Sequence, residues 1–331
     1  SNRGEDIVNV FEKLCQDSRV KLHFEESVLS VAKSKVTKVA KSKILKDKNA
    51  EVKSNYTIQS IQADEKKVKS TFDILVITTG GNAYQATGST GDGYALAKSL
   101  GHSVTKLGAS LNSFSTEETW CHELAGISLP EARFDIELSS GEKKTVTGPM
   151  IFTHFGISGP VVFAMAGQVA FEDILETKPL KVKLIPNSQL NFENCNARIL
   201  HEINKDGTRP LVNIIMSFVP RRLAETILAL TDTKVEVGAV LTKENRFAIV
   251  RLLTGEMELN LTTKMAGAEF VTAGGIELEE IERKTMESKL NKNLFFAGEV
   301  LNIDAVTGGF NLQSAWATGR TAGSAISKMF S

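Results

Sequence analysis

The segment from residue 294 to residue 323 has the residue types and spacing of a ligand-binding strand, loop and helix. An apolar run ends before Gly298 and Glu299, and Gly308-Gly309 precedes a helical pattern. A helix that begins at this glycine pair presents free N–H groups and the positive end of its dipole, which suit an anionic oxygen. Gly298 allows the backbone to approach a ligand closely, and Glu299 can bond ligand hydroxyls. The pattern predicts a site for an anionic ring with a hydroxylated chain, as in a reduced flavin and its ribityl group.

Small residues along this helix are expected to leave room for a sheet or a ligand; they are Ala315, Gly319, Ala322 and Gly323. A second ligand-contacting turn is predicted at Gly80-Gly81, which ends the apolar run 72–81. Such a run is typical of a strand buried on both faces of an α/β sheet, and ligands bind at the carboxyl ends of these strands. A helix is expected to follow over 91–101, with Asp92 in its first turn.

Residues 152–160 place His154 close to Ser158 and thereby invite a hydrolase interpretation. The nucleophile-elbow motif needs glycine two residues after the serine, where this chain has Pro160. We therefore expect Ser158 to cap the following helix. His154 is a candidate proton donor because imidazole titrates near neutral pH, and a structural role is the alternative. The run 120–123, Trp-Cys-His-Glu, has no second ligand cluster, so no metal site is predicted.

The remaining patterns predict the elements that position these residues. Residues 5–16 are expected to form a helix and residues 20–32 a strand. The lysine-rich stretch 33–48 is typical of an exposed hairpin, with nucleic-acid binding as the disfavoured alternative because it lacks aromatic residues. Period-two alternation over 109–190 predicts an antiparallel sheet or barrel. Helical patterns fill 191–255, with Pro220 in a first turn and Thr242 as a cap.

The composition bounds the class of protein. A chain of 331 residues is expected to form two or three domains. It has 39 Lys plus Arg and 39 Asp plus Glu, which gives no global argument for a nucleic-acid partner. Three isolated cysteines and the lack of a long apolar run predict a cytoplasmic protein with no membrane partner. A small-molecule substrate is expected, and the oligomeric state is left open.

Five segments, in order, resemble a family of bacterial NAD(P)/FAD-dependent oxidoreductases, among them aminoacetone oxidases and bile-acid dehydro-reductases; the segments are 78–81, 87–94, 152–160, 271–275 and 294–323. The resemblance covers most of the chain. It implies a split glutathione-reductase-like FAD-binding α/β domain with an inserted antiparallel β-barrel and a small helical subdomain. The implied division is 1–108 with 289–331 for FAD, 109–190 with 256–288 for the barrel, and 191–255 for the helices.

The same resemblance implies FAD as cofactor and NAD(P)H as a transient reductant that passes a hydride through the flavin to a small enone or amine. By matching position it assigns contacts with FAD to Val28, Thr79, Gly80, Gly81, Thr90, Gly91, Asp92, Gly93, Gly298, Glu299, Gly308, Gly309, Asn311 and Leu312. The sequence departs from the family at Thr78, Asn302 and Ala305, where Ala, Asp and Gly are common.

A larger departure concerns the phosphate-binding loop. Members of the family begin with a strand and GxGxxG, whose amides hold the pyrophosphate, and no GxGxxG occurs in these 331 residues. Residues 1–10 instead resemble a helix well inside the family sequence. The expectation is that a preceding segment is missing or that the protein is truncated, so that this stretch binds FAD weakly or not at all. The alternative function is a degenerate flavoprotein acting as a non-catalytic binding module.

Overall fold

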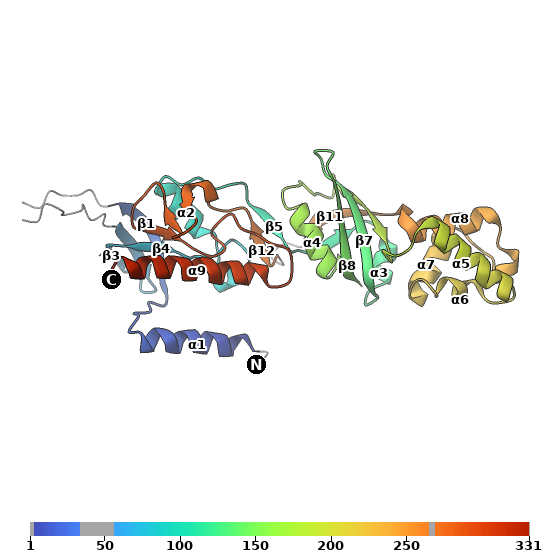
Figure 1. The fold of residues 1–331 in the computed structure, drawn as a ribbon, viewed down its shortest axis with the longest axis horizontal. Coiled ribbons are helices and arrows are strands. Elements are labelled where there is room, and N and C mark those ends of the chain that lie inside the picture. Colours follow the sequence, from blue (N-terminus) through green and yellow to red (C-terminus); the bar gives the residue numbers. More distant parts are fainter. Residues whose placement is uncertain (1–2, 34–55, 265–268, 331) are drawn as a thin grey trace, which may run out of the picture.

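The computed structural model describes residues 3–33, 56–264 and 269–330. Figure 1 shows an elongated molecule in which an α/β body, a barrel and a group of helices follow one another along the long axis. The α/β body contains strands from the first hundred residues and from the last sixty. The order along the chain is therefore α/β, barrel, helices, barrel, α/β, because the chain leaves the first body and returns to it.

The α/β body is built on a four-stranded sheet with the order β13-β14-β15-β4. Its strands are β13 (Ile281–Glu282), β14 (Glu287–Ser288), β15 (Leu294–Phe296) and β4 (Leu75–Ile77). β15 and β4 are parallel, as expected for an α/β sheet. Helices α2 (Asp92–Ser99) and α9 (Phe310–Lys328) contribute Leu96 and Ala322 to the same core as the strands. This is a Rossmann-like α/β arrangement.

The strand predicted over 72–81 is only partly as expected. Leu75 and Ile77 are buried, but Val76 between them is 38% exposed, so β4 is not buried on both faces. The reason is its place in the sheet: among the described strands, β4 pairs with β15 alone and lies at the edge.

A separate three-stranded antiparallel sheet, β1-β2-β3, lies beside this body; its strands are β1 (Glu26–Lys33), β2 (Tyr56–Gln62) and β3 (Lys67–Phe72). The strand predicted from residue 20 thus begins only at Glu26. Glu25 has φ +53°, a left-handed conformation that interrupts an extended chain. The hairpin predicted for 33–48 lies outside the described residues from residue 34 onward.

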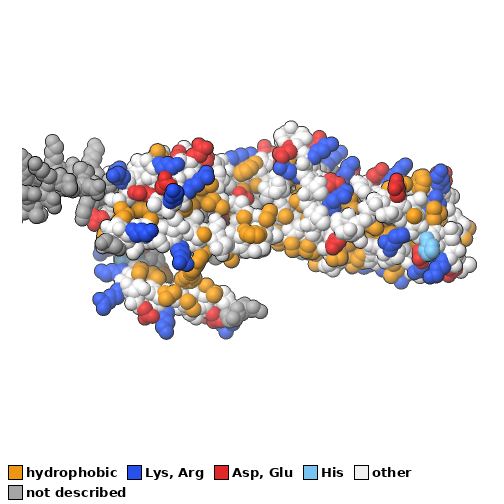
Figure 2. All heavy atoms as spheres, viewed as in Figure 1, with side chains coloured by type: hydrophobic (Ala, Val, Ile, Leu, Met, Phe, Trp, Pro, Cys, Tyr) orange, Lys and Arg blue, Asp and Glu red, His pale blue; other side chains and the backbone are white. Residues whose placement is uncertain are grey.

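Helix α1 (Gly4–Asp17) confirms the predicted N-terminal helix and lies apart from the body in Figure 1. Its apolar side is exposed, and Figure 2 shows hydrophobic side chains on the surface of this helix. The side chains are Ile7, Val8, Val10, Phe11 and Leu14, at 46–58% exposure. One contact with the body is the ring of Phe11, whose centroid lies 6.2 Å from that of Trp316 on α9. None of the described helices is long and apolar enough to cross a membrane.

The predicted antiparallel barrel is confirmed and is closed, with strand order β10-β11-β6-β9-β8-β7. Its strands are β6 (Phe114–Thr116), β7 (Ser128–Glu137), β8 (Lys143–Thr153), β9 (Gly156–Ser158), β10 (Leu180–Ile185) and β11 (Met257–Lys264). Helices α3 (Thr119–Glu123) and α4 (Pro160–Gln168) accompany it. Packing explains the glycine at position 156, since a Cβ there would lie 2.3 Å from the carbonyl oxygen of Phe114.

Four helices form the far end of the molecule: α5 (Phe192–Lys205), α6 (Leu211–Ile215), α7 (Arg221–Leu230) and α8 (Lys243–Arg251). The hydroxyl of Thr242 accepts a hydrogen bond from the backbone N–H of Asn245, which confirms the predicted cap of α8. Pro220 lies at the N-cap of α7. These helices share one continuous hydrophobic core with the barrel, whereas the α/β body has its own.

Strand pairing differs from the sequence-based division at its boundaries. Of the range 256–288 assigned to the barrel, only β11 joins it. β12 (Val271–Ala273) pairs instead with β5 (Gly108–Ser110), and β13 and β14 pair in the α/β sheet. Figure 1 shows the β5–β12 pair between the two bodies. The two-residue strands β13 and β14 are too short to give a period of their own in the sequence.

Candidate functional site

Thr272 on β12 lies in the segment 271–275 and contacts two other glycine-containing segments, the one that includes Gly81 and the one that includes Glu299. Its backbone N–H donates to Oε1 of Glu299 at 2.7 Å, and its hydroxyl accepts from the N–H of Asn82 at 2.7 Å. A Cβ at Gly81 would lie 2.5 Å from this hydroxyl and 2.8 Å from Oε1 of Glu299. Segments far apart in the sequence therefore meet at the strand pair between the two bodies, and only glycine fits at position 81 without displacing a neighbour.

The start of α2 reaches the same place. A Cβ at Gly93 would lie 1.9 Å from the hydroxyl oxygen of Thr79 and 3.1 Å from the side chain of Val300. Gly80 and Gly91 have φ +76° and +80°, a conformation that favours glycine. The structure thus brings the turn after β4, the start of α2, β12 and the turn after β15 together. Thr90 and Asp92 are exposed at this rim.

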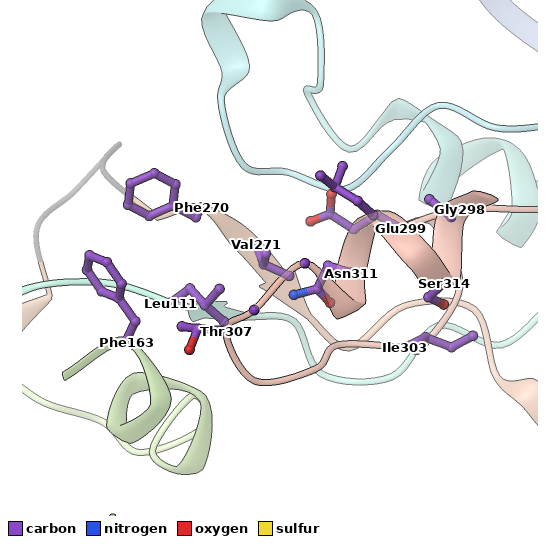
Figure 3. A pocket seen from close by; sticks show the side chains of 14 residues that line it. Leu111, Phe163, Phe270, Val271, Gly298, Glu299, Ile303, Thr307, Asn311 and Ser314 are labelled. Carbon is purple, nitrogen blue, oxygen red and sulfur yellow. The ribbon is translucent and has the colours of Figure 1, made fainter. Parts of the chain in front are cut away.

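A pocket of about 320 Å³ opens beside this junction, and Figure 3 shows its lining side chains. Six of the predicted cofactor residues line it: Gly298, Glu299, Gly308, Gly309, Asn311 and Leu312. The other predicted residues of the turn after β4 and of α2 are not among the lining residues. Val28 lies on β1 in the other sheet and is 39% exposed.

The pocket contains the start of α9, the longest described helix. Gly309 is its N-cap with φ +85°, Gly308 has φ +108°, and no described side chain caps the helix. Asn311 fixes the preceding loop, because its side-chain amide donates to the carbonyl of Ala305 and accepts from its N–H, both at 2.9 Å. The first N–H groups of a helix lack intrahelical partners, so this end can bind an anionic oxygen.

Two acidic side chains make the electrostatics of this region unusual. Burial raises the pKa of Glu299 despite the opposing hydrogen bonds from Thr272, and the negative charge of Asp304 adds to the rise. Burial likewise raises the pKa of Asp304. Behind them Tyr94 is 5% exposed, and burial together with the charge of Glu299 raises its pKa to about 12. The site thus has carboxyl groups that take up a proton more readily than ordinary ones.

The two residues singled out in the segment 152–160 lie elsewhere. His154 is exposed in the turn between β8 and β9, packs edge-on against Phe155, and does not line the pocket. The predicted cap by Ser158 is wrong: Gly159 is the N-cap of α4, and Ser158 ends β9 with its hydroxyl 2.8 Å from that of Ser113. Pro160 at the first helical position leaves Ser158 one residue too early to act as N-cap.

The predicted close approach along α9 is observed at two of its four positions, because Ala322 is 2% exposed in the core of the α/β body and Ala315 lines the pocket. A Cβ at Gly319 or at Gly323 would meet no described atom within 4 Å. Both glycines are themselves exposed, so these two positions are open on the described surface. The sequence pattern of small residues does not distinguish a packed helix face from an open one.

Sequence reasoning missed the aromatic end of the pocket. Phe163 on α4 and Phe270 before β12 line it, together with Leu111, whose φ is +52°. Nothing in the sequence around Phe163 or Phe270 indicates a ligand. Their proximity depends on the pairing of β12 with β5, which the sequence does not reveal.

A buried hydrogen-bonded group was missed as well. His102 contacts Oε2 of Glu280 through Nδ1 at 2.9 Å and the hydroxyl of Ser288 through Nε2 at 2.8 Å. The order resembles a hydrolase triad, but the Ser288 oxygen also accepts from the N–H groups of Leu290 and Asn291. Its lone pairs are therefore occupied, and Ser288 is buried. The group connects α2 to β13 and β14 and has a structural role.

Within the described ranges, no three His, Cys, Asp or Glu side chains gather as metal ligands would. A family model described as the Rossmann domain of HI0933-like proteins matches residues 1–325. This match extends over the α/β body, the barrel and the helices.

Three curated relatives are similar over most of the chain. A ribosomal RNA dihydrouridine synthase of Haemophilus influenzae is 29% identical over 314 residues, which are 92% of this chain and 73% of that protein. A 3-dehydro-bile acid delta(4,6)-reductase of Clostridium scindens is 27% identical over 269 residues, 81% of this chain and 65% of the relative. A ribosomal RNA dihydrouridine synthase of Escherichia coli is 26% identical over 321 residues, 95% of this chain and 70% of the relative. The chain thus spans about two thirds to three quarters of their lengths.

Proposed function

The chain belongs to the family of HI0933-like Rossmann-domain proteins, and on this premise we propose that it is an FAD-dependent oxidoreductase acting on a small organic substrate. The observation that carries the proposal is the pocket at the start of α9. Six residues that the flavoprotein resemblance assigned to the cofactor line this one pocket, although they come from two separate stretches of the loop and helix after β15.

The residues present fit a flavin. Gly308 and Gly309 leave the start of α9 without side chains that would cover its free N–H groups, and these can hold the anionic pyrimidine edge. Gly298, with φ +81°, allows a ring or chain to lie against the backbone. Glu299 accepts one hydrogen bond from Thr272 and has a second oxygen for ribityl hydroxyls. When bound, FAD supplies the hydride-carrying ring; the protein supplies position and electrostatics.

The names of the relatives support reduction of a ring double bond as the reaction. Dihydrouridine is uridine with two hydrogens added to its ring double bond, and a delta(4,6)-reductase also acts on carbon–carbon double bonds. Both names support the enone of the sequence-based expectation rather than the amine, since none of the three relatives is named an aminoacetone oxidase. For this chain, Glu299 lines the pocket and is the candidate to hold the proton that such a reduction requires, because partial burial favours its protonated form.

NAD(P)H is proposed as the reductant. The sequence contains no GxGxxG that would hold a second dinucleotide, so the nicotinamide would bind only transiently over the flavin. Stopped-flow reduction of FAD-loaded protein with NADH and with NADPH tests this step. Reduction by neither, with turnover supported by another donor, would contradict it.

A non-catalytic flavoprotein remnant is the second candidate, favoured by the lack of the GxGxxG loop in the sequence. The test that separates the two begins with the visible absorption spectrum of the purified chain after incubation with excess FAD and gel filtration. Flavin absorbance that decays on addition of NAD(P)H and a conjugated enone supports the enzyme. Flavin that is bound but not reduced supports the binding module, and a colourless protein contradicts the enzyme for this chain.

The other sequence-based expectations stay proposals. They are the cytoplasmic location, a small-molecule partner without nucleic acid or membrane, a proton-donating role for His154, and the division into FAD, barrel and helical parts. Substitution His154→Asn tests the role of His154. Slower reduction of the substrate by the variant would support the role. Unchanged kinetics, which the exposed position of His154 outside the pocket favours, would contradict it.

A further inference from the structure

The pocket has two chemically different ends. Glu299, Asn311 and Ser314 lie toward one end, near the start of α9, whereas Phe163, Phe270 and Leu111 form the other, as Figure 3 shows. The polar end is the part assigned above to the flavin. The aromatic end includes residues from the barrel side, because Phe163 belongs to α4 and Phe270 lies in the connection from β11 to β12. Ligand sites form preferentially where two such bodies meet.

The aromatic end is a small cluster of rings from three different elements. The centroids of Phe163 and Phe270 are 5.3 Å apart and their planes are inclined by 53°. Tyr84, which precedes the short helix 85–87, packs edge-on against Phe270 at 5.6 Å. Phe270 and Tyr84 remain 47% and 46% exposed. Clustered apolar side chains that stay exposed at a pocket are candidates for contact with a ligand.

From these contacts we propose that Phe163 and Phe270 bind the substrate by stacking against a planar ring whose double bond is conjugated with a carbonyl. The inference rests on the proposed function and adds the substrate class. Aromatic faces attract flat, unsaturated rings through dispersion and quadrupole interactions, whereas a saturated, puckered ring makes fewer close contacts. Tyr84 acts as a positioning residue, because its edge contact restricts the orientation of Phe270.

A pyrimidine base and a steroid enone both contain such a planar conjugated ring, so the experiment tests one ligand of each kind. Four probes are compared: uridine, dihydrouridine, a 4-en-3-one steroid and its saturated 3-ketone. A small primary amine is the fifth, because ring faces also attract cations. Affinities are measured by saturation-transfer NMR titration on the whole chain, with and without FAD. FAD binding is measured separately by its visible spectrum.

The variants are Phe163→Leu and Phe270→Leu, which keep an apolar side chain and remove the ring. Phe72→Leu is the matched control, because Phe72 on β3 is 46% exposed and does not line the pocket. We expect the wild-type chain to bind one planar probe at least several-fold more tightly than its saturated counterpart. Each pocket variant should weaken that planar probe by about tenfold, as loss of one stacking contact does. The control should bind like the wild type.

The outcomes separate this inference from the proposed function. Equal binding of planar and saturated probes, binding of neither, a preference for the amine, or unchanged affinity in both pocket variants would overturn it. Loss of FAD from the pocket variants would also overturn it, since the rings would then belong to the flavin site. If the chain binds no FAD but keeps a planar preference that depends on the two phenylalanines, the oxidoreductase proposal fails and the inference stands.

Discussion

Oε1 of Glu299 accepts a hydrogen bond of 2.7 Å from the backbone N–H of Thr272, and this contact links the turn after β15 to β12. The carboxyl group is half-buried beside the pocket, and burial raises its pKa above the ordinary value of 4.5. One side chain therefore both holds two segments together and is costly to ionise in the folded state. Substitution by glutamine is expected to keep the first property and to remove the second.

Substitution Glu299→Gln is expected to raise the free energy of unfolding, relative to the wild type, more at pH 7 than at pH 4. The amide oxygen can still accept from Thr272, while the charge is removed. An acid whose pKa is raised by folding lowers the free energy of unfolding as pH rises from its unfolded value through its folded value, because the folded state resists ionisation. Urea unfolding of wild type and variant at both pH values measures the difference. Glu279→Gln, at an exposed position, is the control, and an equal effect of Glu299→Gln at pH 4 and pH 7 would contradict the prediction.

Gly81→Ala should destabilise the protein by about 1–3 kcal/mol, the usual cost of forcing an extra carbon into a packed site. The new Cβ would meet the Thr272 hydroxyl and the Glu299 carboxyl at less than 3 Å. Gly319→Ala on α9 is the matched control, because its Cβ has open space. It should stabilise the protein by up to about 1 kcal/mol through helix propensity. Chemical unfolding checks both, and similar destabilisation by both would refute the packing argument.

His102 should make the fold sensitive to mild acid. Burial lowers its pKa from 6.5 despite the nearby Glu280, which favours the charged form. The unfolded state then binds more protons, so the free energy of unfolding falls as pH drops below about 6.5. Urea unfolding between pH 7.5 and 5 should show this slope in the wild type, and His102→Gln should remove it at the expense of overall stability.

The control for this prediction is His201→Gln, at an exposed position of α5. It should retain the wild-type dependence on pH. Because Glu299 contributes a dependence of opposite sign, the test is the difference in the free energy of unfolding between wild type and His102→Gln; a difference that is constant between pH 7.5 and 5 would show that protonation of His102 is not linked to unfolding. A slope that persists in His102→Gln would assign the dependence to another group.

Local patterns in the sequence predicted individual elements well where one residue type determines the conformation. Thr242 caps α8 and the glycine pair 308–309 precedes α9, because a hydroxyl cap and left-handed glycines act within a few residues. The period-two stretch likewise predicted the barrel, since alternation reports which face is buried. The resemblance also named six of the residues that line the pocket.

Features that depend on distant pairing could not be predicted. The pairing of Val271 with Ser110 brings Phe270 to the pocket, and no local pattern at either residue indicates it. The contact of His102 with Glu280 and Ser288 spans more than 170 residues. Ser158 shows that a local pattern can also mislead. Serine often caps a helix, but α4 begins at Pro160, so Gly159 is the N-cap and Ser158 lies in a strand. In each case tertiary contacts decide which local preference is used.

Asn311 is the residue whose substitution tests the flavin site most directly. Asn311→Ala removes two hydrogen bonds of 2.9 Å with the backbone of Ala305 and so releases the loop before α9. We expect FAD affinity to fall by about thirtyfold at most, since each of the two bonds contributes about 1 kcal/mol. Amide hydrogen exchange at Ala305 should become faster, a readout that does not require bound flavin. Asn204→Ala, at an exposed position of α5, should change neither property. Faster exchange with unchanged FAD affinity would show that this loop is free of the flavin, and unchanged exchange would show that Asn311 does not hold it.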